Sequence, residues 1–222
     1  MVWFKHAKPP EPSMKKLIFA LCAAALPAAF AAGGGAGDLP EPFGYPSTLL
    51  DAPATLAEPP GGYVQTGRLR SMLGEARLAP IAERHHAAHL REGAGDFARD
   101  YACLTGTEGG RPVILWLIAT GSEELTEAQL EWTETVPRSC GRLQARELPV
   151  RLGRIGLGMT EAEVDEHLGT ASWDDGFGWR FWFSQRFLKN ARGLQELELN
   201  WLGVQFEAGR VKRAFASLVR NP

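Results

Sequence analysis

The sequence predicts an α+β protein, in which antiparallel β-sheets carry short helices packed on one face. Residues 160–169 contain the start and stop signals of a short amphipathic helix. Residues 178–219 alternate polar and apolar side chains over strand-like lengths, with turn residues between them. Residues 111–120 form an apolar, β-branched run that is typical of a central strand.

The N-terminal sequence predicts export. Residues 1–13 resemble no targeting signal, and we interpret them as lying upstream of the true start at Met14. Lys15 and Lys16, the apolar run 17–30 and the small residues that follow form a signal peptide over residues 14–31. We therefore expect a bacterial protein that is periplasmic or secreted.

We expect the mature chain to have no membrane anchor. The apolar run 17–30 is too short and too rich in alanine for a stable span, and it is removed with the signal peptide. Cys22 is not expected to carry a lipid, because the bulky Leu21 stands where lipoprotein signals have a small residue.

The charge balance argues against a nucleic-acid partner. The chain has 24 basic and 26 acidic residues, a net charge of −2. Cleavage after Ala31 removes four lysines and one glutamate, which leaves a net charge of −5. Since nucleic-acid binding needs a basic surface, we expect no nucleic-acid partner.

The mature chain is expected to begin with a flexible lead and continue into a first α+β unit. Residues 32–66 are rich in proline and glycine and show little periodicity. The first unit, 67–149, starts with an expected short helix over 67–76, while 77–96 fits a second helix or an irregular strand equally well. Residues 97–105 and 111–120 read as a hairpin, and 129–136 as a further strand.

Two cysteines remain after export. In an oxidising compartment Cys103 and Cys140 are most simply a disulfide, which would stabilise the fold by about 2–4 kcal/mol. A free catalytic thiol is the alternative, but no partner motif accompanies either cysteine.

The second unit, 150–222, is predicted as a helix followed by three antiparallel strands. Thr160 and Glu163 have the spacing of a capping box, Val164 and Leu168 share one helical face, and Gly169 ends the helix. Strands are expected over 178–188, over the segment from 196 to 206 with a bulge near Gly203, and over 211–219.

A short internal repeat suggests two tandem helix-plus-meander units. Residues 73–76 (LGEA) and 168–171 (LGTA) both end an expected helix, and each is followed by a loop and antiparallel strands. Four-residue matches also arise by chance, so duplication stays an open alternative.

The second unit also carries a family resemblance. The segment GLGMTEAEVDEHLGTAS, followed by aromatic strands and VQFEAGRVKRA, resembles the SmpA/OmlA type of small outer-membrane lipoprotein and the related fold of β-lactamase inhibitory proteins. The matching positions are Gly158, Met159, Thr160, Glu163, Val164, Leu168 and Gly169. Ala171 stands where the family pattern has proline, and the lipid-attachment cysteine is absent. The resemblance implies a non-catalytic envelope protein that binds another protein.

The candidate partner-binding site is on the strand 178–188. Trp179, Phe181, Phe183 and Phe187 occupy its expected inward phase, whereas Trp182 falls on the outward phase between Arg180 and Arg186. An exposed tryptophan flanked by arginines has the composition of a binding hot spot. Alternatively, Glu196 and Glu198 pair with those arginines across the sheet and the first unit covers Trp182.

A metal-dependent enzyme is a weaker reading. His85, His86 and His89 form the only histidine cluster, and on a helix His85 and His89 would share a face, with Glu83 and Asp96 nearby as acidic neighbours. We prefer a solvated helix face as the explanation of the cluster, because no third ligand with convincing spacing is visible. Asp174 and Asp175 could bind a cation, although a polar turn is the plainer reading.

The sequence therefore favours a non-catalytic, exported module that binds another envelope or secreted protein through a sheet face. It contains no nucleophile elbow, phosphate loop or HExxH motif, so no catalytic residue and no cofactor are assigned. An inhibitor of an envelope or secreted hydrolase is the first alternative, and a metal-dependent enzyme is the second.

Overall fold

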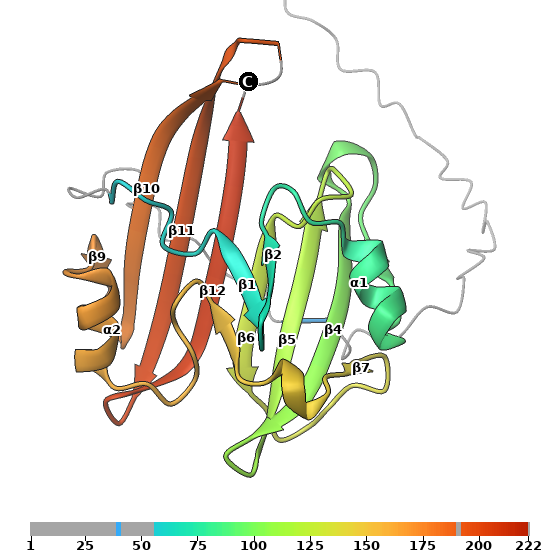
Figure 1. Ribbon diagram of the computed structural model, residues 1–222, viewed down its shortest axis with the longest axis vertical. Helices are drawn as coiled ribbons and strands as arrows, with labels where there is room; N and C mark the ends of the chain where they lie inside the picture. Colours follow the sequence, from blue (N-terminus) through green and yellow to red (C-terminus); the bar gives the residue numbers. More distant parts are fainter. Residues whose placement is uncertain (1–38, 41–55, 190–191, 222) are drawn as a thin grey trace, which may run out of the picture. The chain divides into compact units, whose positions relative to one another are not determined.

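Antiparallel β-sheet makes up most of the described protein, together with two short helices (Figure 1). The computed structural model describes residues 39–40, 56–189 and 192–221, all within one unit of the chain, 33–222. The predicted α+β class is thus confirmed, with strands dominating. The predicted start at Met14, the signal peptide, Cys22 and residues 32–38 and 41–55 of the lead lie outside the described residues.

A nine-stranded sheet forms the body of the fold. Its strand order is β3-β4-β5-β6-β12-β11-β10-β9, and β7 pairs in parallel with β4. All other pairings in it are antiparallel. The strands are β3 (Leu90–Glu92), β4 (Arg99–Glu108), β5 (Arg111–Thr120), β6 (Glu127–Trp132), β7 (Gly141–Arg142), β9 (Trp173–Asp174), β10 (Trp179–Lys189), β11 (Gln195–Glu207) and β12 (Arg210–Asn221).

A second, three-stranded sheet replaces the helix expected over 67–76. Its order is β2-β1-β8, formed by β1 (Tyr63–Thr66), β2 (Leu69–Met72) and β8 (Val150–Leu152). Gly67 has a φ of 59° in the two-residue turn between β1 and β2, a conformation that suits a hairpin. The helix prediction is wrong, and β1 also lies inside the lead that was expected to be flexible.

Each of the two helices precedes a three-stranded meander. Helix α1 (Leu78–His85) comes before β4, β5 and β6, and helix α2 (Glu161–Leu168) comes before β10, β11 and β12. The last strands of the two meanders, β6 and β12, pair antiparallel and join both into one sheet. Residues 77–96, left open by the sequence, contain both α1 and the short strand β3.

The main core lies on one face of the nine-stranded sheet. Leu78 and Ala82 of α1, Val164 of α2 and the small sheet all contribute to it, together with buried residues from six strands of the large sheet. Residues of both helices therefore belong to the same core cluster. Two 3₁₀ turns, η2 (Gly95–Phe97) and η3 (Ala145–Glu147), complete the described elements.

The opposite face of the sheet is also buried. Phe181, Phe183 and Trp201 form one cluster there, and Tyr101, Cys103, Ile114, Trp116 and Ile118 form another. Because both faces are covered, apolar residues occupy neighbouring positions of a strand, as with Trp201 and Leu202 of β11. The expected bulge near Gly203 is therefore wrong, and the register of β11 with β12 shifts instead between Gln205 and Phe206.

The predicted disulfide is confirmed. Cys103 in β4 is bonded to Cys140, just before β7, across a sequence separation of 37 residues. The hairpin of β4 and β5 is confirmed as well, whereas the strand expected over 129–136 is β6 and ends at Trp132. In the part of the chain that is described, no helix has the length and apolar character to cross a membrane.

Candidate functional site

Helix α2 begins at the capping box that the sequence predicted. The Thr160 hydroxyl accepts a hydrogen bond from the Glu163 N–H at 3.3 Å, and the Glu163 carboxylate accepts one from the Thr160 N–H at 2.7 Å. The hydrogen bonds from Thr160 lower the pKa of Glu163. Gly169, with a φ of 71°, ends the helix. These signals are local, and they position α2 beside β10.

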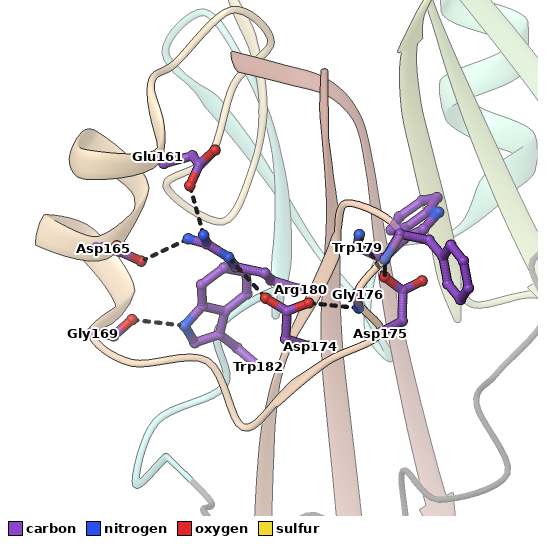
Figure 2. Close-up of polar contacts among 10 residues, drawn as sticks. Glu161, Asp165, Gly169, Asp174, Asp175, Gly176, Trp179, Arg180 and Trp182 are labelled. Atoms are coloured by element: carbon purple, nitrogen blue, oxygen red, sulfur yellow. Dashed lines mark hydrogen bonds and ion pairs between the residues drawn. The ribbon is translucent and has the colours of Figure 1, made fainter. Parts of the chain in front are cut away.

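Arg180 ties α2 to β10. Its guanidinium lies 2.6 Å from Glu161 and 3.7 Å from Asp165, both on α2, and 3.3 Å from Asp174 on β9 (Figure 2). The three carboxylates come from two elements on either side of the arginine. Arg180, proposed from the sequence to bind a partner, thus pairs with acidic groups of its own chain.

Trp182 is not exposed, and the expectation that it faces solvent is wrong. Its side chain is 0% exposed and belongs to the main core. The indole Nε1 donates a hydrogen bond of 3.0 Å to the Gly169 carbonyl oxygen at the end of α2 (Figure 2). The alternation along β10 is correct, but the face expected to be outward is the one that packs on the main core, and Phe181 and Phe183 lie in a separate cluster on the opposite face. A side chain so buried cannot contact a partner without unfolding.

Arg186 pairs across the sheet with Glu198, as the alternative reading allowed. Its Nε donates to Glu198 at 2.7 Å, and its Nη1 lies 3.8 Å from Glu58. Glu198 is only 1% exposed and is also bound by Arg220 at 2.9 Å. Two guanidinium groups compensate the buried carboxylate, so Arg186 has a structural role here.

A short loop beside Arg180 presents the most exposed aromatic residue of this region. Asp174 accepts a hydrogen bond from the Gly176 N–H at 2.8 Å, as Figure 2 shows. Asp175 accepts from the N–H groups of Phe177 at 2.7 Å and of Trp179 at 3.0 Å. Phe177 is 87% exposed. We call residues 174–178 the aspartate loop.

Two half-buried tryptophans flank the aspartate loop. The Trp173 ring lies 5.2 Å from the Phe181 ring, and the Trp179 ring stacks on Phe181 at 5.9 Å between centroids. Phe177 is therefore exposed on a loop that has a partly buried tryptophan at each end. The sequence did contain a signal for this loop, because two aspartates followed by Gly-Phe-Gly are typical of a turn stabilised by aspartate side chains.

The histidines do not form the expected i, i+4 pair. Helix α1 ends at His85, and His86 has a left-handed φ of 55°, so His89 lies beyond the helix. His85 lies 3.2 Å from the Arg142 carbonyl oxygen and 3.7 Å from Glu147, whereas His89 lies 3.2 Å from Asp100. Among the described residues, no group of three His, Cys, Asp or Glu side chains is placed to hold a metal ion.

Two titratable groups have raised pKa values on the face of the nine-stranded sheet that lies opposite the main core. Burial raises the pKa of Glu127, although its ion pair with Arg99 acts in the opposite direction. Burial and a hydrogen bond of 2.9 Å to Glu92 raise the pKa of Tyr101 to about 12. Both groups have partners within the sheet, so a structural role explains them and no catalytic role is needed.

Comparisons with protein-family models, with characterised proteins and with solved structures found no match to this chain. The resemblance to the SmpA/OmlA lipoproteins and to the β-lactamase inhibitory proteins therefore stays a prediction.

Proposed function

We propose that the protein is an exported, non-catalytic module that binds another envelope or secreted protein through the aspartate loop. The observation that carries this proposal is the 87% exposure of Phe177 on a loop whose backbone is held by two aspartates. The sequence predicted that a sheet face makes the contact. Because Trp182 is buried, we assign the contact to the neighbouring loop instead.

The loop is preorganised for binding. The Asp175 carboxylate holds two backbone N–H groups, and Arg180 holds Asp174 against β10. A loop that is already ordered loses little conformational entropy when it binds, so more of the contact energy appears as affinity. Tryptophan is enriched among the residues that dominate protein interfaces, and phenylalanine is enriched in interface cores.

The shape of the loop supports one more specific form of the proposal. A single projecting phenylalanine fits a concave site better than a flat one, and enzyme active sites are concave. This geometry supports the alternative in which the protein inhibits an envelope or secreted hydrolase. Titration of the protein against a panel of such hydrolases tests it, since uniformly unchanged rates would remove this form of the proposal.

The binding proposal is tested by cross-linking in periplasmic extract followed by mass spectrometry. Phe177→Ala should lose a partner that the wild-type protein retains, because it removes the projecting anchor. Phe97→Ala is a matched control, since Phe97 is also 87% exposed but lies in a different turn, η2. Equal retention by both variants, or equal loss, would contradict the assignment to the aspartate loop.

A further inference from the structure

Three arginines without side-chain partners line one hollow of the surface. The hollow has a volume of about 650 Å³ and is bounded by six residues, namely Thr66, Arg68, Leu69, Arg84, Arg146 and Glu147. In the described part of the chain, the side chains of Arg68, Arg84 and Arg146 make no hydrogen bond, ion pair or ring contact. We call this feature the arginine hollow.

Close packing of three elements forms the arginine hollow. At Gly67, in the turn between β1 and β2, an added Cβ would lie 2.1 Å from the Arg146 carbonyl oxygen, so the turn is pressed against η3. His85 at the end of α1 reaches the Arg142 carbonyl oxygen and Glu147. The turn, the helix end and η3 are thereby held around one space, and each contributes one arginine.

The charges of these arginines are not neutralised within the hollow. Glu147, its only acidic residue, is 7% exposed and is occupied by the Gln144 N–H at 2.7 Å and by His85. Arginines elsewhere, such as Arg180 and Arg186, pair with carboxylates of the chain. The arginine hollow is therefore positively charged, although the net charge of the whole chain is −2.

An edge strand borders the arginine hollow. Strand β2 pairs with β1 on one side only, and no strand pairs with its other side within the described residues. The hairpin register directs the backbone N–H and C=O of Arg70 away from β1. Leu69, which is 51% exposed, and Met72, which is 41% exposed, add apolar surface to the same strand. Free backbone groups at a sheet edge are a template for an extended peptide.

We propose that the arginine hollow and the β2 edge bind an extended acidic segment of a partner protein. Carboxylates of the segment would accept hydrogen bonds from Arg68, Arg84 and Arg146, a match that guanidinium groups make with high geometric specificity. Its backbone would pair with β2, and its apolar side chains would cover Leu69. This surface is separate from the aspartate loop, so the two assignments stand or fall independently.

The test uses a fluorescent peptide of alternating glutamate and valine, followed by anisotropy. The wild-type protein should bind it, with an affinity that falls as salt is added. Replacing Arg68, Arg84 and Arg146 together by glutamine should weaken binding about tenfold or more, because charge-assisted hydrogen bonds are lost. These arginines are exposed, so circular dichroism should show an unchanged fold.

A matched control replaces Arg138, Arg142 and Arg154 by glutamine. These arginines are also exposed, their side chains make no hydrogen bond, ion pair or ring contact in the described residues, and the change in charge is the same. The control should keep the wild-type affinity. An equal loss in the control would overturn the proposal, as would equal binding of a lysine–valine peptide. Tighter binding of phenyl phosphate through the same three arginines would also overturn it, in favour of a phosphoryl ligand.

Discussion

Phe177 and Trp182 are close in sequence, flank the same arginine, and lie in opposite environments. Trp182 is 0% exposed and is hydrogen-bonded to the end of α2, whereas Phe177 is 87% exposed at the aspartate loop. Both are large apolar side chains in a segment rich in aromatic residues. The difference is what lies over them, since α2 packs on the strand but leaves the loop uncovered.

A polar–apolar alternation identifies the two faces of a strand but not what covers each of them. Trp182 and Phe181 point to opposite faces of β10, and both are buried. A sheet face that looks solvent-exposed from the sequence is buried when helices or a second sheet pack on it. The binding residue therefore has to be sought where the covering elements end.

The largest expected effect is that of Trp182→Ala. Loss of a fully buried tryptophan should lower the free energy of unfolding by about 3–5 kcal/mol, because it leaves a cavity in the main core. Urea unfolding followed by circular dichroism measures it. A loss below about 1 kcal/mol, in the range of an exposed position, would contradict the burial on which the comparison rests.

Arg180→Met should have the next largest effect. The variant keeps the apolar stem of the side chain but leaves Glu161, Asp165 and Asp174 close together without a cation. We expect a loss of about 1–2 kcal/mol in the free energy of unfolding, since the three carboxylates are partly exposed. The loss should shrink when urea unfolding is repeated in high salt, because salt screens the repulsion. A loss independent of salt would argue against the charge network.

Asp175→Ala should have a smaller effect on stability, of about 1 kcal/mol. The variant removes the acceptor of two backbone N–H groups in the aspartate loop without touching the core. Asp175→Asn keeps an acceptor oxygen and should recover most of the loss. Amide hydrogen exchange of Phe177 and Trp179 should quicken in the alanine variant alone. Unchanged exchange would mean that Asp175 does not hold the loop.

Phe177→Ala should have the smallest effect, below about 0.5 kcal/mol, because the side chain is almost fully in solvent. Phe97→Ala should match it in urea unfolding. A loss as large as that of Trp182→Ala would show that Phe177 is packed in the folded protein, and the contrast between the two aromatic residues would disappear.

Several elements were predictable because their signals are local. The capping box of Thr160 and Glu163 and the end at Gly169 place α2 within its own sequence. The apolar run 111–120 coincides with β5, and two cysteines in the expected mature chain gave the disulfide. In each case the residues that decide the structure are few and are visible without knowledge of the rest of the chain.

Other elements depended on distant partners. Residues 69–72 read as a helix from Leu69, Met72 and Leu73, but they form β2 because β1 pairs with them and β8 extends that sheet from far along the chain. The sequence also could not show which arginines pair with carboxylates of the chain and which do not. Arg180 and Arg186 meet carboxylates of their own chain, whereas Arg68, Arg84 and Arg146 meet none.

The sequence by itself determined the α+β class, the helix α2, the meander after it and the pairing of Cys103 with Cys140. These features follow from propensity, capping, periodicity and a count of cysteines. Only the tertiary structure decided that Trp182 is core, that Phe177 projects, and that three arginines share one hollow. Exposure and charge pairing depend on which distant segments pack together, and a local pattern of residues does not contain that information.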